Sequence, residues 1–114
     1  MSTILKTIPF IKDEAYGWQD VEPGTKRKIV VYDENIMQVK VMFEKGAIGT
    51  LHQHPHVQLS YVSKGAFEVQ IDGEKQVLKA GDSFYVASNL VHGVVCIEDG
   101  ELVDIFNPYR KDFI

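Results

Sequence analysis

Short runs in which apolar and polar residues alternate, separated by glycine and acidic turn residues, most constrain the fold of this chain. In residues 66–72 every second side chain is apolar, and the Asp72-Gly73 pair that follows is typical of a hairpin turn. A period of two places one face of a strand against a core and the other in solvent. The pattern therefore predicts antiparallel sheet, and helix signals are weak throughout.

The same pattern recurs along most of the chain. We expect strands at residues 28–32, 36–43, 57–62, 66–72, 75–78, 83–86, 93–97 and 102–106. Residues 33–35 would be the turn of a first hairpin, and the spacing is close to that of a small sandwich or barrel. For the first twenty residues a short helix, an edge strand or an arm reaching across a dimer each fit. We expect an N-terminal arm at residues 1–24 and a single barrel domain at residues 25–114.

Composition narrows the class of protein. The 114 residues, 45% of them hydrophobic and 25% charged, suffice for one globular core. A net charge of -4 disfavours nucleic acid and anionic membranes as partners. The single cysteine, Cys96, excludes an internal disulfide, and we find neither a membrane-spanning run nor a signal peptide. We expect a cytoplasmic protein.

The histidines are clustered in a way that indicates a metal site. His52, His54 and His56 fall within five consecutive residues, and His92 is the fourth histidine of the chain. Residues two apart on an extended strand project to one face, so His52 and His54 can bind one ion together, and Gln58 has the same parity. His92 can join them if the fold brings it alongside. His56 is open to three interpretations: support of the ligands, contact with a substrate, or a turn residue.

Asp104 is a second candidate functional residue. It interrupts an apolar strand and shares a face with Leu102 and Phe106, where an ionised carboxylate is costly. It is either a general acid or base with a raised pKa beside the metal, or a strand-edge aspartate bonded to a turn. Arg110 could hold a substrate carboxylate with two hydrogen bonds, or be an ordinary solvated arginine.

Two glycine-framed segments resemble the motifs of the cupin superfamily. The first runs Gly46, five residues, His52-Gln53-His54, three residues, Gln58, six residues, Gly65. The second runs Gly81, five residues, Ala87, Asn89, two residues, His92, three residues, Cys96. Gln58 stands where the family has glutamate, and Ala87, Asn89 and Cys96 also depart from it. The resemblance implies an all-β fold, the double-stranded β-helix or jelly-roll barrel. It also implies that His52, His54, Gln58 and His92 bind one divalent transition metal ion: zinc, nickel, manganese or iron.

The glutamine has chemical consequences. Three histidines and a neutral amide leave the full charge on the ion, which makes it a stronger Lewis acid. Iron oxygenases usually pair histidines with a carboxylate, so Gln58 favours polarisation of a substrate oxygen over oxygen chemistry. Alternatively, Gln58 is a degenerate ligand in a barrel that only binds sugar.

Residues 27–113 resemble more closely the small pectin-degradation cupins of the KdgF type, which linearise unsaturated monouronates. The segments that carry this resemblance are residues 43–47, 52–58, 72–74, 79–82, 91–93 and 104–113. It implies catalytic roles for Asp104 and Arg110, substrate binding by Phe106 and Arg110, and a homodimer. The function expected is a metal-dependent enzyme of isomerase type that opens cyclic 4,5-unsaturated uronates to the linear keto form. The alternatives are a cupin dioxygenase with a redox metal and a non-catalytic sugar-binding cupin.

Overall fold

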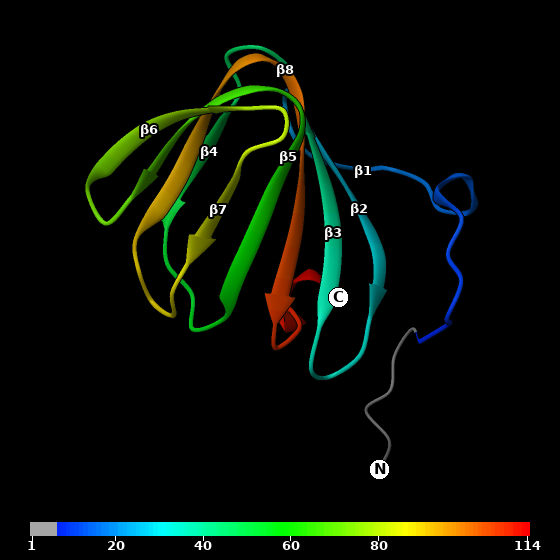
Figure 1. Ribbon diagram of the computed structural model, residues 1–114. Coiled ribbons are helices and arrows are strands. Elements are labelled where there is room, and N and C mark those ends of the chain that lie inside the picture. Colours follow the sequence, from blue (N-terminus) through cyan, green and yellow to red (C-terminus); the bar gives the residue numbers. More distant parts are fainter. Residues whose placement is uncertain (1–6) are drawn as a thin grey trace.

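The computed structural model describes residues 7–114, which form an antiparallel jelly-roll barrel (Figure 1). Its strands are β1 (Gln19–Glu22), β2 (Thr25–Tyr32), β3 (Met37–Phe43), β4 (Ile48–His52), β5 (Val57–Ile71), β6 (Glu74–Lys79), β7 (Ser83–Val86) and β8 (His92–Asn107). Two short 3-10 helices, η1 (Asp13–Ala15) and η2 (Lys111–Phe113), complete the described elements. The predicted all-β fold class is confirmed. None of the helical segments in residues 7–114 has the length and apolar character needed to cross a membrane.

The barrel is organised around two long, bent strands. The strand order is β1-β2-β3-β8-β5-β6, with β4 paired to β8 and β7 paired to β5. β5 and β8 pair along most of their lengths, with register shifts between Val62 and Phe67. Gly65 lies at this bend with a φ of 76°, and a Cβ there would come within 2.3 Å of the Asp99 carbonyl oxygen. Only glycine fits such a close backbone approach.

This continuity differs from the prediction. The sequence indicates four separate strands at residues 57–62, 66–72, 93–97 and 102–106, whereas the structure joins them into two. The predicted hairpins are confirmed. β2 and β3 pair around a turn in which the Asp33 carboxylate accepts hydrogen bonds from the backbone of Asn35 and Ile36. Asp72 and Gly73 both have positive φ angles, as their hairpin between β5 and β6 requires.

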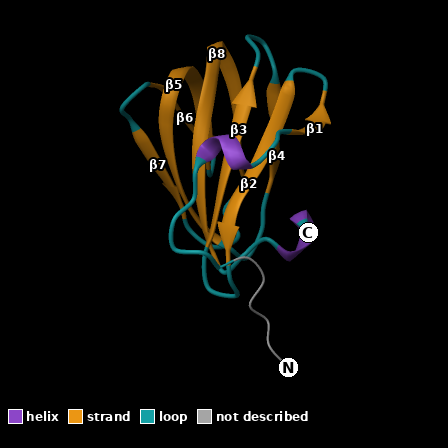
Figure 2. Ribbon diagram, turned by 90° about the vertical axis from the view of Figure 1, so that its right-hand side faces the viewer, coloured by secondary structure: helices purple, strands orange, loops and turns teal. Residues whose placement is uncertain are grey.

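In the described part of the chain, η1 packs against the outside of β2 and β3, and Figure 2 shows it lying across the strands. Asp13 of η1 accepts hydrogen bonds from Lys28 of β2 and Lys40 of β3. β1 extends the sheet as an edge strand beside β2. Both elements lie within the range expected for the arm, residues 1–24, of which residues 1–6 are outside the described part. The boundary between arm and barrel stays a prediction.

Two apolar clusters fill the barrel. The larger includes Phe67, Val62, Val86 and Cys96. The smaller, made by Met37, Val39 and Phe106, packs against Tyr109 and Phe113 near the C-terminus. Because Gln58 at the start of β5 pairs with Phe106 near the end of β8, this smaller cluster adjoins the histidines described next.

Candidate metal centre

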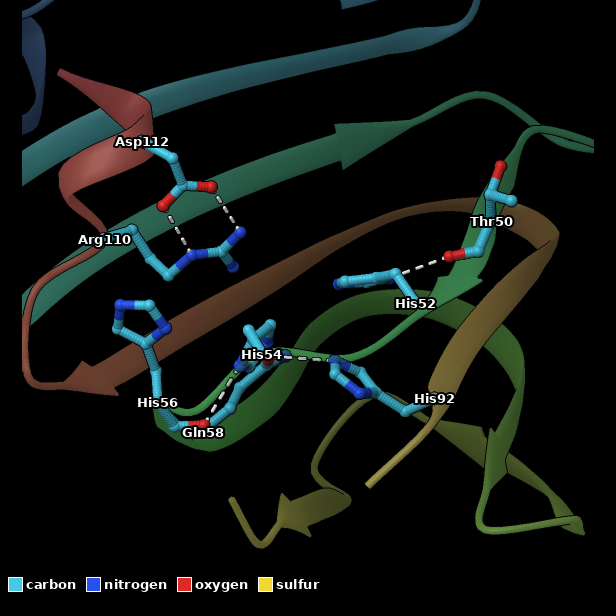
Figure 3. A network of polar contacts seen from close by, with 8 residues as sticks. All are labelled: Thr50, His52, His54, His56, Gln58, His92, Arg110 and Asp112. Atoms are coloured by element: carbon cyan, nitrogen blue, oxygen red, sulfur yellow. Dashed lines mark hydrogen bonds and ion pairs between the residues drawn. The ribbon is translucent and has the colours of Figure 1, made fainter. Parts of the chain in front are cut away.

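Three of the predicted ligands are brought together at one end of the barrel. His52 ends β4, His92 begins β8, and His54 lies in the loop before β5. A ligating nitrogen from each can be chosen so that all lie within 4.8 Å of one another. Figure 3 shows the three imidazoles turned toward a common point. His54 and His92 are buried and His52 is exposed, so the point they share is reached from solvent.

The protein backbone fixes which nitrogen each histidine offers. Each ring places Nδ1 within hydrogen-bond distance of a carbonyl oxygen: Thr50 at 2.8 Å for His52, His56 at 3.0 Å for His54, and Leu90 at 2.9 Å for His92. A carbonyl can only accept, so each Nδ1 carries the proton and donates it. Each Nε2 is left with a free lone pair, the form in which histidine binds metals.

Gln58 completes the set in a way that calls for a cation. Its Oε1 lies 3.1 Å from Nε2 of His54 and 3.2 Å from Nε2 of His92. With the protons on Nδ1, all three atoms are acceptors that face one another. A metal ion among them would satisfy all three lone pairs, so these residues fit the divalent ion that the sequence predicts.

The electrostatics of the site favour the neutral forms of His54 and His92. Burial, helped by the charge of Arg110, lowers the pKa of His54 to about 4. Burial also lowers the pKa of His92. Since a metal competes with a proton for the imidazole lone pair, a depressed pKa favours metal binding near neutral pH.

Asp104 lies close to this set and is connected to it by hydrogen bonds. It is 8% exposed and shares the inner face of β8 with Leu102 and Phe106, as the alternation predicts. The amide nitrogen of Gln58 donates to Ser60 Oγ at 2.9 Å, and Ser60 Oγ donates to Asp104 Oδ1 at 2.6 Å. Burial raises the pKa of Asp104 to about 6, although the Ser60 hydrogen bond and Arg110 oppose the shift.

Arg110 is buried, which excludes the interpretation of an ordinary solvated arginine. Its Nε and Nη2 donate to the two carboxylate oxygens of Asp112 at 3.0 and 2.8 Å. The guanidinium also lies over two aromatic rings, 5.1 Å from the centre of Phe106 and 4.2 Å from that of Phe113. One edge of the fork is thus taken by the chain's own carboxylate, and Nη1 and one Nη2 hydrogen remain for a ligand.

His56 lies beside Arg110 (Figure 3). Its ring makes edge contacts with His54 and Phe106, with centroids 5.4 and 6.5 Å away. Burial and the charge of Arg110 lower its pKa. Of the three interpretations, support of a ligand is seen in its backbone carbonyl, which accepts the hydrogen bond from His54 Nδ1, and contact of its ring with a substrate stays a prediction.

Two residues of the site were missed by the sequence reasoning. Ser60 is two residues from Gln58 on the same strand, and this shared parity was the one signal that could have placed it on the inner face. Its partner Asp104 is 44 positions away, so the hydrogen bond between them follows only from the strand register. Asp112 is two residues from Arg110, and nothing in its local pattern separates it from a solvated acid.

Known proteins share this fold and this chain length. The family model for the cupin domain matches residues 39–106. The pectin degradation protein KdgF of Dickeya dadantii (strain 3937) is 49% identical over 107 residues, which cover 92% of this chain and 96% of that protein.

Two solved structures superpose closely. The structure of KdgF from Halomonas sp. has a TM-score of 0.91 and 45% identity, and the match covers 95% of this chain and 100% of that one. An RmlC-like cupin from Shewanella frigidimarina NCIMB 400 has a TM-score of 0.92 and 42% identity, with 96% and 98% covered. The similarity therefore extends over nearly the whole chain.

Proposed function

Because this chain belongs to the cupin family, and within it to the KdgF-type cupins, we propose that it acts on the products of pectin or alginate breakdown. The reaction we propose is the opening of cyclic 4,5-unsaturated monouronates to their linear keto form. The observation that carries the proposal is the set of inward lone pairs on His52, His54, His92 and Gln58, of which Gln58 is hydrogen-bonded through Ser60 to a carboxylate of raised pKa.

His52, His54, Gln58 and His92 would hold the ion, and zinc, nickel, manganese and iron are each compatible with this donor set. When bound, the ion supplies positive charge that polarises oxygen atoms of the substrate. No ligand of the set carries a negative charge, so no ligand neutralises part of the charge of the ion.

Asp104 is the group we assign to proton transfer. With a pKa of about 6 it is ionised at neutral pH yet basic enough to accept a hydroxyl proton. The hemiacetal hydroxyl at C1 loses its proton to Asp104, the C1 carbonyl forms, and the bond from C1 to the ring oxygen breaks. The ring oxygen leaves as an enolate oxygen on C5, and one proton, returned by the protonated Asp104 or by water, adds at C4 to give the ketone. Atoms and electrons balance without an oxidant or reductant.

Arg110 and Phe106 are assigned to substrate binding. The guanidinium would attract the uronate carboxylate and oppose the negative charge that develops on the enol oxygen. The Phe106 ring is 2% exposed beneath Arg110 and beside His54, so it would pack against the sugar only once Arg110 has moved aside. A two-bond grip on the substrate carboxylate through Nε and Nη2 requires Asp112 to leave.

We further propose that the chain works as a cytoplasmic homodimer. Leu59 and Tyr61 of β5 and Tyr85 of β7 are about half exposed on the outer face of the barrel, and Leu59 pairs with Tyr85 across the strands. Exposed apolar groups of this kind support contact between the sheets of two copies.

A proton NMR time course tests the reaction directly. An unsaturated galacturonate monomer is mixed with the purified protein, and the vinyl proton at C4 is followed with and without a chelator. Faster loss of that signal with growth of the linear ketone, abolished by the chelator and restored by added metal, is the expected result. No acceleration by protein that carries metal would refute this substrate assignment, and the unsaturated mannuronate monomer would be tested next.

A further inference from the structure

Ser60 stands between the two chemical parts of the site. It has no exposed surface, and it lies opposite Asp104 in the pairing of β5 with β8. Its hydroxyl accepts a hydrogen bond from the Gln58 amide and donates one to Asp104. The chain from Asp104 through Ser60 to Gln58 is therefore continuous and buried.

The direction of these hydrogen bonds is set by Asp104. A serine hydroxyl has one proton, and here it is donated to Asp104 Oδ1 over 2.6 Å, a short distance typical of a charged acceptor. The side of the hydroxyl that faces Gln58 is then a lone pair, which only the amide nitrogen can satisfy. With its nitrogen turned to Ser60, the amide must turn its oxygen to His54 and His92.

We propose that Ser60 is a positioning residue that, through its bond to Asp104, presents the oxygen and not the nitrogen of Gln58 to the metal. The inference rests on the metal site of the proposed function. A flipped amide would turn two N–H groups and no lone pair toward the ion, so the fourth ligand would be lost. A glutamate at this position would offer the metal an oxygen in either orientation, because its two oxygens are equivalent. The need to fix the orientation of the side chain therefore arises only because residue 58 is glutamine.

The first test is the affinity of the metal-free protein for Zn²⁺, measured by competition with a chromophoric chelator. Ser60→Ala should weaken binding by about 10- to 100-fold, the usual cost of losing a residue that orients a ligand. Ser63→Ala is the matched control, because Ser63 is exposed on the same strand and its hydroxyl also donates to a carboxylate of β8, Glu101, at 2.6 Å. The control should bind Zn²⁺ as the wild type does.

The second test separates orientation from packing. In a Gln58→Glu background the added Ser60→Ala change should shift affinity by no more than about twofold, the usual scatter for independent sites. A cavity or packing defect at Ser60 would weaken binding equally in both backgrounds. Ser60→Cys, which keeps a weak donor of similar size, should lie between serine and alanine and serves if the alanine variant does not fold.

The outcomes distinguish the two proposals. Failure of the wild type to bind Zn²⁺ would refute the metal site itself. Wild-type binding with an unchanged Ser60→Ala variant, or an equal loss in the wild-type and Gln58→Glu backgrounds, would overturn the role of Ser60 and leave the metal site standing.

Discussion

Replacing Asp104 with asparagine should stabilise the metal-free protein at neutral pH while it abolishes the proposed reaction. The carboxylate is buried among apolar groups and keeps one hydrogen bond from Ser60, which does not offset its loss of water. Asparagine has nearly the same shape and can still accept the Ser60 hydrogen bond through its oxygen, but it carries no charge. The gain in stability should therefore equal the cost of ionising the buried acid.

The size of the effect follows from the pKa of Asp104, which burial raises from its ordinary 3.8 to about 6. Between these values the folded protein holds a proton that the unfolded chain has lost. The free energy of unfolding contributed by Asp104 therefore falls as pH rises, by about 1.4 kcal/mol per pH unit. The full difference, about 3 kcal/mol, is reached above pH 6 and is absent below about pH 4.

Urea unfolding of the chelated wild type and Asp104→Asn, repeated from pH 4 to pH 8, measures this difference. The stability advantage of the variant should grow across the interval and then level off. Asp20→Asn, which changes an exposed carboxylate on the edge strand β1, is the control and should show no such growth. An advantage independent of pH, or a less stable variant at pH 8, would refute the claim that the ionised carboxylate is a burden on the fold.

Three further predictions concern other parts of the molecule. Gly65→Ala should lower the free energy of unfolding by about 3 kcal/mol or more, because Gly65 has a positive φ angle and the added Cβ would clash with the Asp99 carbonyl. Gly17→Ala is the control: no atom lies near the added Cβ, so the free energy of unfolding should change by less than about 0.5 kcal/mol. Arg110→Ala should lower kcat/KM for the unsaturated uronate by about 30-fold or more in the NMR assay, and unchanged kinetics would remove Arg110 from the site. Cys96 is buried and its pKa is raised by burial, so a thiol reagent should label it only as fast as the protein unfolds in urea; immediate labelling of the folded protein would contradict its place in the core.

The sequence predicts the barrel because its strands are regular over most of their length. The alternation in residues 66–72 and the Asp72-Gly73 turn appear in the structure as expected. The bends of β5 and β8 were not predicted, because the polar residues and glycines at 63–65 and 98–101 form sequence patterns that are typical of loops. In the structure Lys64 pairs with Glu101 across the two strands, and the Gly65 carbonyl accepts a hydrogen bond from the backbone of Ala80. For β1, an edge strand was only one of three alternatives, because all four of its residues are exposed and show no alternation.

Much of the candidate site follows from residue type and spacing. The three predicted histidines converge, and Asp104 faces inward because its parity on β8 is that of Leu102 and Phe106. The hydrogen bonds between strands did not follow, because Ser60 reaches Asp104 only at the register that the fold selects. The roles assigned to these residues in catalysis stay proposals that the experiments above test.

At the end of the barrel where the histidines meet, the charge of Arg110 is already paired with the carboxylate of Asp112. An incoming anion must replace this carboxylate or share the guanidinium with it, and a small anion such as chloride or acetate exchanges one partner for another with little net gain. A uronate brings a carboxylate and hydroxyl groups on one rigid ring, so it can contact Arg110 and the histidine side of the site together. Competition from Asp112 therefore favours ligands that contact both Arg110 and the histidine side of the site. Buffer anions, which contact Arg110 alone, should be weak inhibitors.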